Sequence, residues 1–277
     1  MALPTQFGVA ISEELLGEAA PVPLQGGLAA GIARAAEIGF GSVEIHIRNP
    51  TSFDGGSLQA RADAAGIRVS AVGTGLEYGL NGLCLTSVDP DIRRRMRLRF
   101  KEHIDLAARL HAVVFLGLCR GKSPTYAERR QYLDRLAEEL LPIVDYADGK
   151  GVVLALEPIV FYLTNLLNTT EETLEFLQKP GLEPIQLLLD THHMFIEDPD
   201  VNAAFRLCAR AGAGEIAHVH LSDSNRRYPG SGNVDYAGMI KTLDELGYVG
   251  ALSMEVLPYP SGEEAAKLGL AYMHSLL

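Results

Sequence analysis

The stretch Ile216–Tyr236, IAHVHLSDSNRRYPGSGNVDY, indicates the fold most directly. It opens with an apolar run typical of a buried β-strand and continues into a loop rich in Ser, Asn, Arg, Pro and Gly. Alternation along a strand predicts that one face carries Ile216, His218, His220 and Ser222. The opposite face is then expected to carry Ala217, Val219 and Leu221. His220 lies toward the carboxyl end of this strand, where the polar loop begins.

Three other apolar segments also end in a residue that can bind a metal ion. They are VVLALE, IQLLLD and ALSME, which end at Glu157, Asp190 and Glu255. With His220 included, these residues are separated by 33, 30 and 35 positions, about the length of one strand–helix unit each. Four consecutive units would therefore each place one oxygen or nitrogen ligand at the same rim of a parallel sheet.

The rest of the chain shows the same alternation of strands and helices. Strands are expected over residues 7–12, 42–47, 67–72, 112–118, 152–156, 185–189, 216–221 and 251–256. Helices are expected over residues 24–38, 58–65, 91–110, 126–150, 171–178, 201–211, 236–246 and 263–276. The Gly-rich segment 73–90 is expected to be a long loop. Eight such units predict a single (β/α)8 TIM barrel over residues 1–277, with eight parallel strands inside an outer ring of helices.

Composition limits the classes of partner and compartment. A chain of 277 residues that is 47% hydrophobic can enclose a large core, and its net charge of −11 argues against nucleic acid. No stretch approaches the ~18 apolar residues of a membrane span, and the first residues lack the pattern of a signal peptide. Cys84, Cys119 and Cys208 show no C-x-x-C spacing and are expected to be reduced thiols. A cytoplasmic location is therefore expected.

The four rim residues are expected to hold one divalent metal ion. Each is the last inward-facing candidate of strands five to eight, and TIM barrels carry their sites at this rim. Three carboxylates and one imidazole suit Mn²⁺, Mg²⁺ or Co²⁺, and the absence of Cys argues against a closed structural zinc site. The alternative is that these are four unrelated polar residues at the ends of strands, but their occurrence in four consecutive strand–helix units favours a common site. The layer beneath is expected to contain Ala155, Leu188, His218 and Ser253.

The segments LALEP, LLLDTHHM, HVHLSDSNRRYPGSGNVDY and SMEV resemble the xylose isomerase-like TIM-barrel sugar phosphate isomerase/epimerase superfamily. The resemblance is closest to the D-tagatose/D-psicose 3-epimerase-like branch. It implies one divalent ion, first of all Mn²⁺ with Mg²⁺, Co²⁺ or Zn²⁺ as alternatives, held by Glu157, Asp190, His220 and Glu255. It also implies that Glu157 and Glu255 are the catalytic acid–base pair, and that His193 and Arg226 contact oxygen atoms of the substrate.

The resemblance thus predicts a metal-dependent isomerase or epimerase that acts on a ketose or keto-sugar through a cis-enediolate. A homodimer or homotetramer is expected, with a small sugar as the substrate. The chain departs from the family after Glu157, where members often carry N-R-Y-E and this chain has VFYL over residues 160–163. Leu163 replaces a charged pocket residue, and this less polar wall would suit a shorter, deoxygenated or glycosidic substrate.

Two further residues are candidates for substrate contacts. His46 alternates with Glu44 on the second strand, so it either faces the pocket or packs at the rim. Arg120 follows the fourth strand with Lys122 and either holds a carboxylate or phosphate or belongs to a solvated turn. His218 is expected to pack in the layer beneath or to support a ligand.

Three alternative functions remain open from the sequence. A lyase, of the inosose dehydratase or 3-oxo-glycoside-cleaving type, would use the same metal and enolate chemistry. Endonuclease IV-type DNA repair would need further histidines after strands three and four, where the chain reads GTGLEYGLN and GLCRGK. A non-catalytic sugar-binding protein would not need two carboxylate bases.

Overall fold

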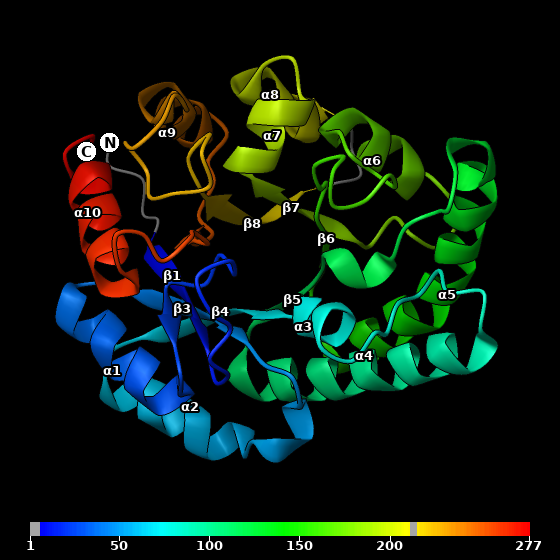
Figure 1. Cartoon of the computed structure of the whole chain (residues 1–277), viewed down its shortest axis with the longest axis horizontal. Helices are drawn as coiled ribbons and strands as arrows, with labels where there is room; N and C mark the ends of the chain where they lie inside the picture. Colours follow the sequence, from blue (N-terminus) through cyan, green and yellow to red (C-terminus); the bar gives the residue numbers. More distant parts are fainter. Residues whose placement is uncertain (1–5, 211–214) are drawn as a thin grey trace.

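The predicted barrel is present in the computed structural model, which describes residues 6–210 and 215–277 (Figure 1). Eight parallel strands pair in chain order, and the last of them, β9, pairs with β1 to close the sheet. These strands are β1 (Phe7–Ser12), β3 (Ser42–His46), β4 (Arg68–Gly73), β5 (Val113–Leu116), β6 (Leu154–Leu156), β7 (Gln186–Asp190), β8 (Ile216–Leu221) and β9 (Leu252–Met254). The short strand β2 (Leu24–Gln25) adds to the carboxyl end of β1.

The helices surround this barrel, as Figure 1 shows. They are α1 (Leu28–Ile38), α2 (Gly55–Ala64), α3 (Gly75–Gly79), α4 (Pro90–Leu110), α5 (Arg129–Lys150), α6 (Thr170–Leu177), α7 (Thr191–Glu197), α8 (Val201–Arg210), α9 (Tyr236–Glu245) and α10 (Gly262–His274). Single 3₁₀ turns cover Pro50–Ser52, Leu118–Arg120 and Tyr126–Glu128. No helix in the described part of the chain combines the length and apolar character that a membrane span requires.

Several local predictions were wrong. The segment after β4 was expected to be a loop but contains α3. Helix α7, which directly follows β7, was not predicted. The first predicted helix begins only at Leu28, because Leu24 and Gln25 pair with β1 and two glycines with positive φ follow them. The predicted helix 201–211 is observed to Arg210, and its last residue, Ala211, lies outside the described residues.

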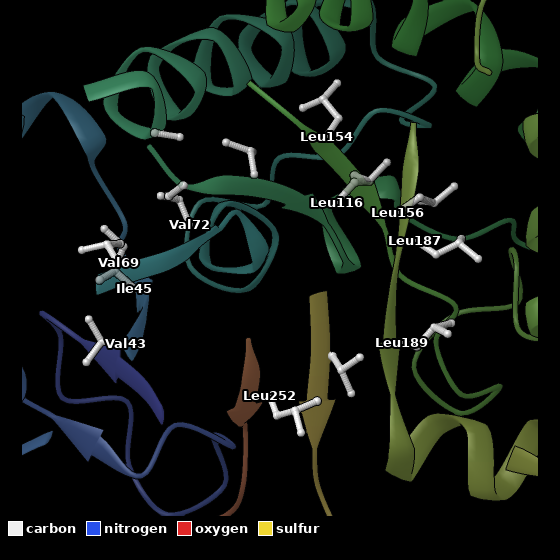
Figure 2. Close-up of a cluster of buried hydrophobic side chains, with 14 of the residues drawn as sticks. Val43, Ile45, Val69, Val72, Leu116, Leu154, Leu156, Leu187, Leu189 and Leu252 are labelled. Atoms are coloured by element: carbon white, nitrogen blue, oxygen red, sulfur yellow. The ribbon is translucent and has the colours of Figure 1, made fainter. Parts of the chain in front are cut away.

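Apolar side chains on the outer surface of the barrel form the main core. Figure 2 shows part of it, with labelled residues from β3, β4, β5, β6, β7 and β9, among them Val43, Leu156 and Leu252. These side chains are buried in one cluster with helix residues such as Ile32 and Phe100. The barrel is therefore held together chiefly by burial of apolar surface between strands and helices, at roughly 25 cal/mol per Å².

A second, smaller cluster belongs to the barrel interior. It consists of Ala71, Phe115, Ala155 and Leu188, one from each of four neighbouring strands. The prediction that Ala155 and Leu188 lie in an inner layer is confirmed. This apolar layer supports the polar residues that follow at the carboxyl ends of the strands.

The predicted alternation along β8 breaks at its start. The register between β7 and β8 shifts, because Leu187 pairs with Ile216 whereas Leu188 pairs with His218. Ala217 is therefore the extra residue of a β-bulge and packs against the inner cluster, while Ile216 packs against the outer core. The predicted faces were wrong for these two residues, whereas both imidazoles do face the interior.

Candidate active site

Four acidic or imidazole side chains meet at the carboxyl ends of β6, β7, β8 and β9. Glu157 and Glu255 follow the last residues of β6 and β9, Asp190 ends β7, and His220 lies in β8. One ligand atom from each of the four lies within 4.8 Å of the others, and all four residues are buried. We call Glu157, Asp190, His220 and Glu255 the ligand cluster.

His220 Nδ1 lies at the centre of the ligand cluster. It is 3.4 Å from Glu157 Oε1, 3.6 Å from Asp190 Oδ2 and 3.5 Å from Glu255 Oε2. This nitrogen is buried and has no hydrogen-bond partner among the described residues. A buried polar atom without a partner is costly, and three carboxylate oxygens around one imidazole nitrogen form a suitable donor set for a divalent cation. The residues therefore fit a metal ion.

Asp190 has two roles because α7 begins directly after β7. Its Oδ1 caps α7 by accepting from the backbone N–H groups of His192 and His193, at 2.8 and 3.4 Å. Its Oδ2 faces the ligand cluster instead. The cap thus fixes the direction in which Asp190 presents its second oxygen.

Arg226 brings a positive charge to the ligand cluster from the loop after β8. Its guanidinium donates to Asp190 Oδ2 and Glu255 Oε2. The backbone of Arg226 has a φ of 62°, which is a left-handed conformation. A hydrogen bond from its backbone N–H to Asp223 O, at 2.8 Å, stabilises this conformation. Burial alone would lower the pKa of Arg226, but the charges of Asp190 and Glu255 raise it above its ordinary value. Arg226 is therefore a permanent cation beside two ligand carboxylates.

Two carboxylates of the ligand cluster differ in proton affinity in the metal-free protein. Burial raises the pKa of Glu157, assisted by the nearby charges of Glu255 and Asp190 and opposed by His220. Burial acts in the same direction on Asp190, but the charge of Arg226 holds the pKa of Asp190 well below its usual range. Glu157 is accordingly suited to carrying a proton, and Asp190 to staying ionised.

His193 lies at the edge of the ligand cluster. Its Nε2 is 3.9 Å from Glu157 Oε1 and 4.0 Å from Asp190 Oδ2. Burial holds the pKa of His193 well below its ordinary value, so the ring is neutral. A neutral imidazole there can donate one hydrogen bond to a bound oxygen.

His192 points away from the ligand cluster into a separate chain of hydrogen bonds. Its Nδ1–H donates to Asp223 O at 3.1 Å, and its Nε2 accepts from the hydroxyl of Tyr162 at 2.8 Å. Tyr162 belongs to the turn after Glu157, in which Phe161, Tyr162 and Leu163 are 59%, 57% and 40% exposed. Leu163 is thus exposed at this rim, at the position where members of the family often have a charged residue.

Glu44 is the residue of this region that sequence analysis missed. Its carboxylate is fully buried and hydrogen-bonded to His46, His218 and His220. His46 Nε2 lies 2.7 Å from Glu44 Oε1 and 3.9 Å from Glu255 Oε1. His46 therefore packs at the rim against Glu44, and its role as a substrate contact stays a prediction. The available signal was the alternation of Glu44 and His46 on one strand.

Arg120 was expected to bind a substrate anion or to lie in a solvated turn, and both expectations were wrong. Its side chain is 0% exposed. The guanidinium donates to five backbone carbonyl groups, those of Leu116, Gly117, Glu157, Leu166 and Leu167. Burial lowers the pKa of Arg120 to about 10, despite the charge of Glu157. Arg120 therefore joins the end of β5 to the segment after β6.

Replacing Arg120 by Met should destabilise the barrel. Several buried carbonyl groups would lose their donor, and one unsatisfied buried group costs about 1–3 kcal/mol, so a loss of about 3 kcal/mol or more is expected. Urea unfolding followed by circular dichroism measures this change. Lys122→Met, at an exposed position on the same segment, is the control and should change stability by less than ~0.5 kcal/mol. Equal stability of the two variants would contradict this account of Arg120.

Gly117 leaves room for the carboxylate of Glu157. A Cβ atom at position 117 would lie 2.9 Å from Glu157 Oε2, closer than side-chain atoms approach. The carboxylate of Glu157 can therefore occupy its place only because residue 117 has no side chain.

Known proteins resemble this chain in sequence and in structure. An L-ribulose 3-epimerase from Mesorhizobium japonicum is 31% identical over 227 residues, which span 81% of this chain and 73% of that protein. A ketose 3-epimerase from Arthrobacter globiformis is 28% identical over 232 residues, spanning 83% and 77%. The crystal structure of a D-allulose 3-epimerase from Methylomonas sp. matches with a TM-score of 0.79, at 24% identity and with 100% of both chains covered. This last likeness shows the fold.

A family model also covers most of the chain. The model described as Xylose isomerase-like TIM barrel matches residues 32–276. These residues include every member of the ligand cluster together with Glu44, His193 and Arg226. The resemblance predicted from the sequence motifs is thereby confirmed. The protein belongs to the xylose isomerase-like TIM barrel family.

Proposed function

We propose that this protein is a metal-dependent ketose 3-epimerase. The observation that carries the proposal is the ligand cluster, in which Glu157 and Glu255 both face the unpartnered Nδ1 of His220. The relatives described above are 3-epimerases of ketoses. The lyase alternative is therefore not retained, and the net charge of −11 favours a sugar over nucleic acid.

Glu157, Asp190, His220 and Glu255 would hold a divalent ion, Mn²⁺ in our proposal, which would supply Lewis acidity that makes the C3 proton of the ketose more acidic. Glu157 and Glu255 come from strands that are separated by β7 and β8, so their carboxylates approach the site from different sides. One can remove the proton from C3 of the sugar, and the other can return a proton to the opposite face of the enediolate. These two proton transfers invert the configuration at C3.

Arg226 and His193 are the proposed substrate contacts. The guanidinium of Arg226 provides a permanent positive charge, and the neutral His193 ring provides a hydrogen-bond donor. Both can stabilise the negative charge that develops on the sugar oxygens as the C3 proton leaves. The exposed apolar turn with Phe161, Tyr162 and Leu163 supports a substrate with a less polar far end. A homodimer or homotetramer and a cytoplasmic location remain predictions.

Deuterium incorporation tests the proposed reaction. The Mn²⁺-loaded protein is incubated in D₂O with L-ribulose, D-psicose or D-fructose, manganese is removed, and the sugars are analysed by NMR. Exchange through an enediolate predicts solvent deuterium at C3 of the epimerised product and nowhere else on the carbon chain. Turnover without deuterium at C3 would require a hydride shift or a shielded proton and would contradict transfer by two carboxylates.

A further inference from the structure

A buried carboxylate behind the ligand cluster organises three imidazole rings. Oε1 of Glu44 is 2.7 Å from His46 Nε2. Oε2 of Glu44 is 2.7 Å from His218 Nε2 and 2.8 Å from His220 Nε2. Glu44 and His46 lie in β3, whereas His218 and His220 lie in β8. The two contacts with β8 therefore cross the barrel interior. All three rings turn the same nitrogen toward one carboxylate.

We propose that Glu44 is a positioning residue that sets the tautomer of the metal ligand His220. A carboxylate ion can only accept hydrogen bonds, so Nε2 of His220 must carry hydrogen in this contact. A histidine must be neutral to bind a metal ion, and the nitrogen of His220 that then has the lone pair is Nδ1, which faces the three ligand carboxylates at 3.4 to 3.6 Å. Glu44 thus prepares His220 to bind an ion through Nδ1. The inference rests on the metal site of the proposed function.

Packing and hydrogen bonding restrain the His220 ring together. The ring of Phe115 contacts His220 edge-on, with centroids 5.3 Å apart, and His218 contacts it in the same way at 5.4 Å. Apolar and edge contacts limit the tilt of the ring but do not distinguish its two nitrogens. The carboxylate of Glu44 makes that distinction at Nε2, because it requires a donor there.

Glu44→Gln is the test variant, because glutamine has the same shape. The amide keeps one accepting oxygen and replaces the other by an NH₂ group that donates. At least one of the three imidazoles must then lose its N–H···O bond or change its tautomer. Glu77→Gln is the matched control, since Glu77 is also fully buried and accepts from His103, Arg99 and Asn81. None of those partners belongs to the ligand cluster.

Two readouts separate positioning from a purely structural role. Metal affinity is measured by competition of Mn²⁺ with a chelator, and we expect Glu44→Gln to weaken it ~10–100-fold while Glu77→Gln leaves it unchanged. Tautomers are measured by ¹⁵N NMR of histidine-labelled, Mg²⁺-loaded wild type, in which His220 should carry hydrogen on Nε2 and none on Nδ1. Glu44→Asp, which keeps the carboxylate, should regain part of the lost affinity.

Failure of the role of Glu44 can be told apart from failure of the proposed function. If folded Glu44→Gln binds Mn²⁺ as tightly as wild type, or if His220 carries hydrogen on Nδ1 in the metal-loaded wild type, the positioning role of Glu44 is wrong but the proposed function is not affected. If Glu44→Gln does not fold, the histidine tautomers of the wild type and the Mn²⁺ affinity of Glu44→Asp still test the positioning role of Glu44. A wild type that binds no divalent ion at millimolar concentration would overturn the proposed function and this inference with it.

Discussion

Glu157→Gln and Glu255→Gln should each slow C3 epimerisation of a ketose by at least ~10²–10⁴-fold, the loss typical of a missing general base. Glutamine keeps an oxygen that can face the metal ion, so both variants should still bind it, although more weakly. Steady-state rates with saturating Mn²⁺ measure the effect.

Glu197→Gln is the matched control for these two variants. Glu197 ends α7 and accepts from the backbone N–H of Phe161 at 2.6 Å, outside the ligand cluster. Its replacement should leave epimerisation within a few-fold of wild type. Near-normal activity of either ligand-cluster variant would show that its carboxylate transfers no proton in a slow step.

Asp190→Asn should lower affinity for the divalent ion by more than the ~10–100-fold typical of residues that only support a ligand. The amide oxygen can still cap α7, so the barrel should remain folded, but a ligand charge is lost. Competition with a chelator measures the affinity, and circular dichroism checks the fold. Epimerase activity should fall in parallel and return in part at high metal concentration.

Asp198→Asn controls for the loss of a carboxylate near the same helix. Asp198 follows α7 and accepts from the N–H and hydroxyl of Thr170, at 3.0 and 2.7 Å. Metal affinity should not change in this variant. An Asp190→Asn protein that binds Mn²⁺ as tightly as wild type would remove Asp190 from the metal site.

The barrel could be predicted because its signals are local and repeated. Each strand is a short apolar run, and the observed bounds of β8, Ile216–Leu221, are those expected from the sequence. The spatial grouping of Glu157, Asp190, His220 and Glu255 also followed, since the carboxyl ends of parallel strands meet at one rim. Regular spacing in sequence therefore became proximity in space.

Features that depend on closure of the barrel could not be predicted in this way. Glu44 and His218 are 174 positions apart, and nothing near either residue indicates the other. Arg120 binds backbone carbonyl groups, which every residue has, so sequence cannot name its partners. The bulge at Ala217 changes a strand register without a glycine or proline to mark it. Helix α7, over Thr191–Glu197, is too short for helical periodicity to be detected.

The central claim is that Glu157 and Glu255 act on opposite faces of the same carbon. Its most direct test is to follow the C3 proton by NMR in D₂O for Glu157→Gln and Glu255→Gln, starting separately from each of the two C3 epimers. With one carboxylate left, each variant can remove and return a proton only on the face which that carboxylate reaches. The account predicts that Glu157→Gln retains exchange from one epimer only and Glu255→Gln from the other. Equal exchange from both epimers in both variants would contradict it.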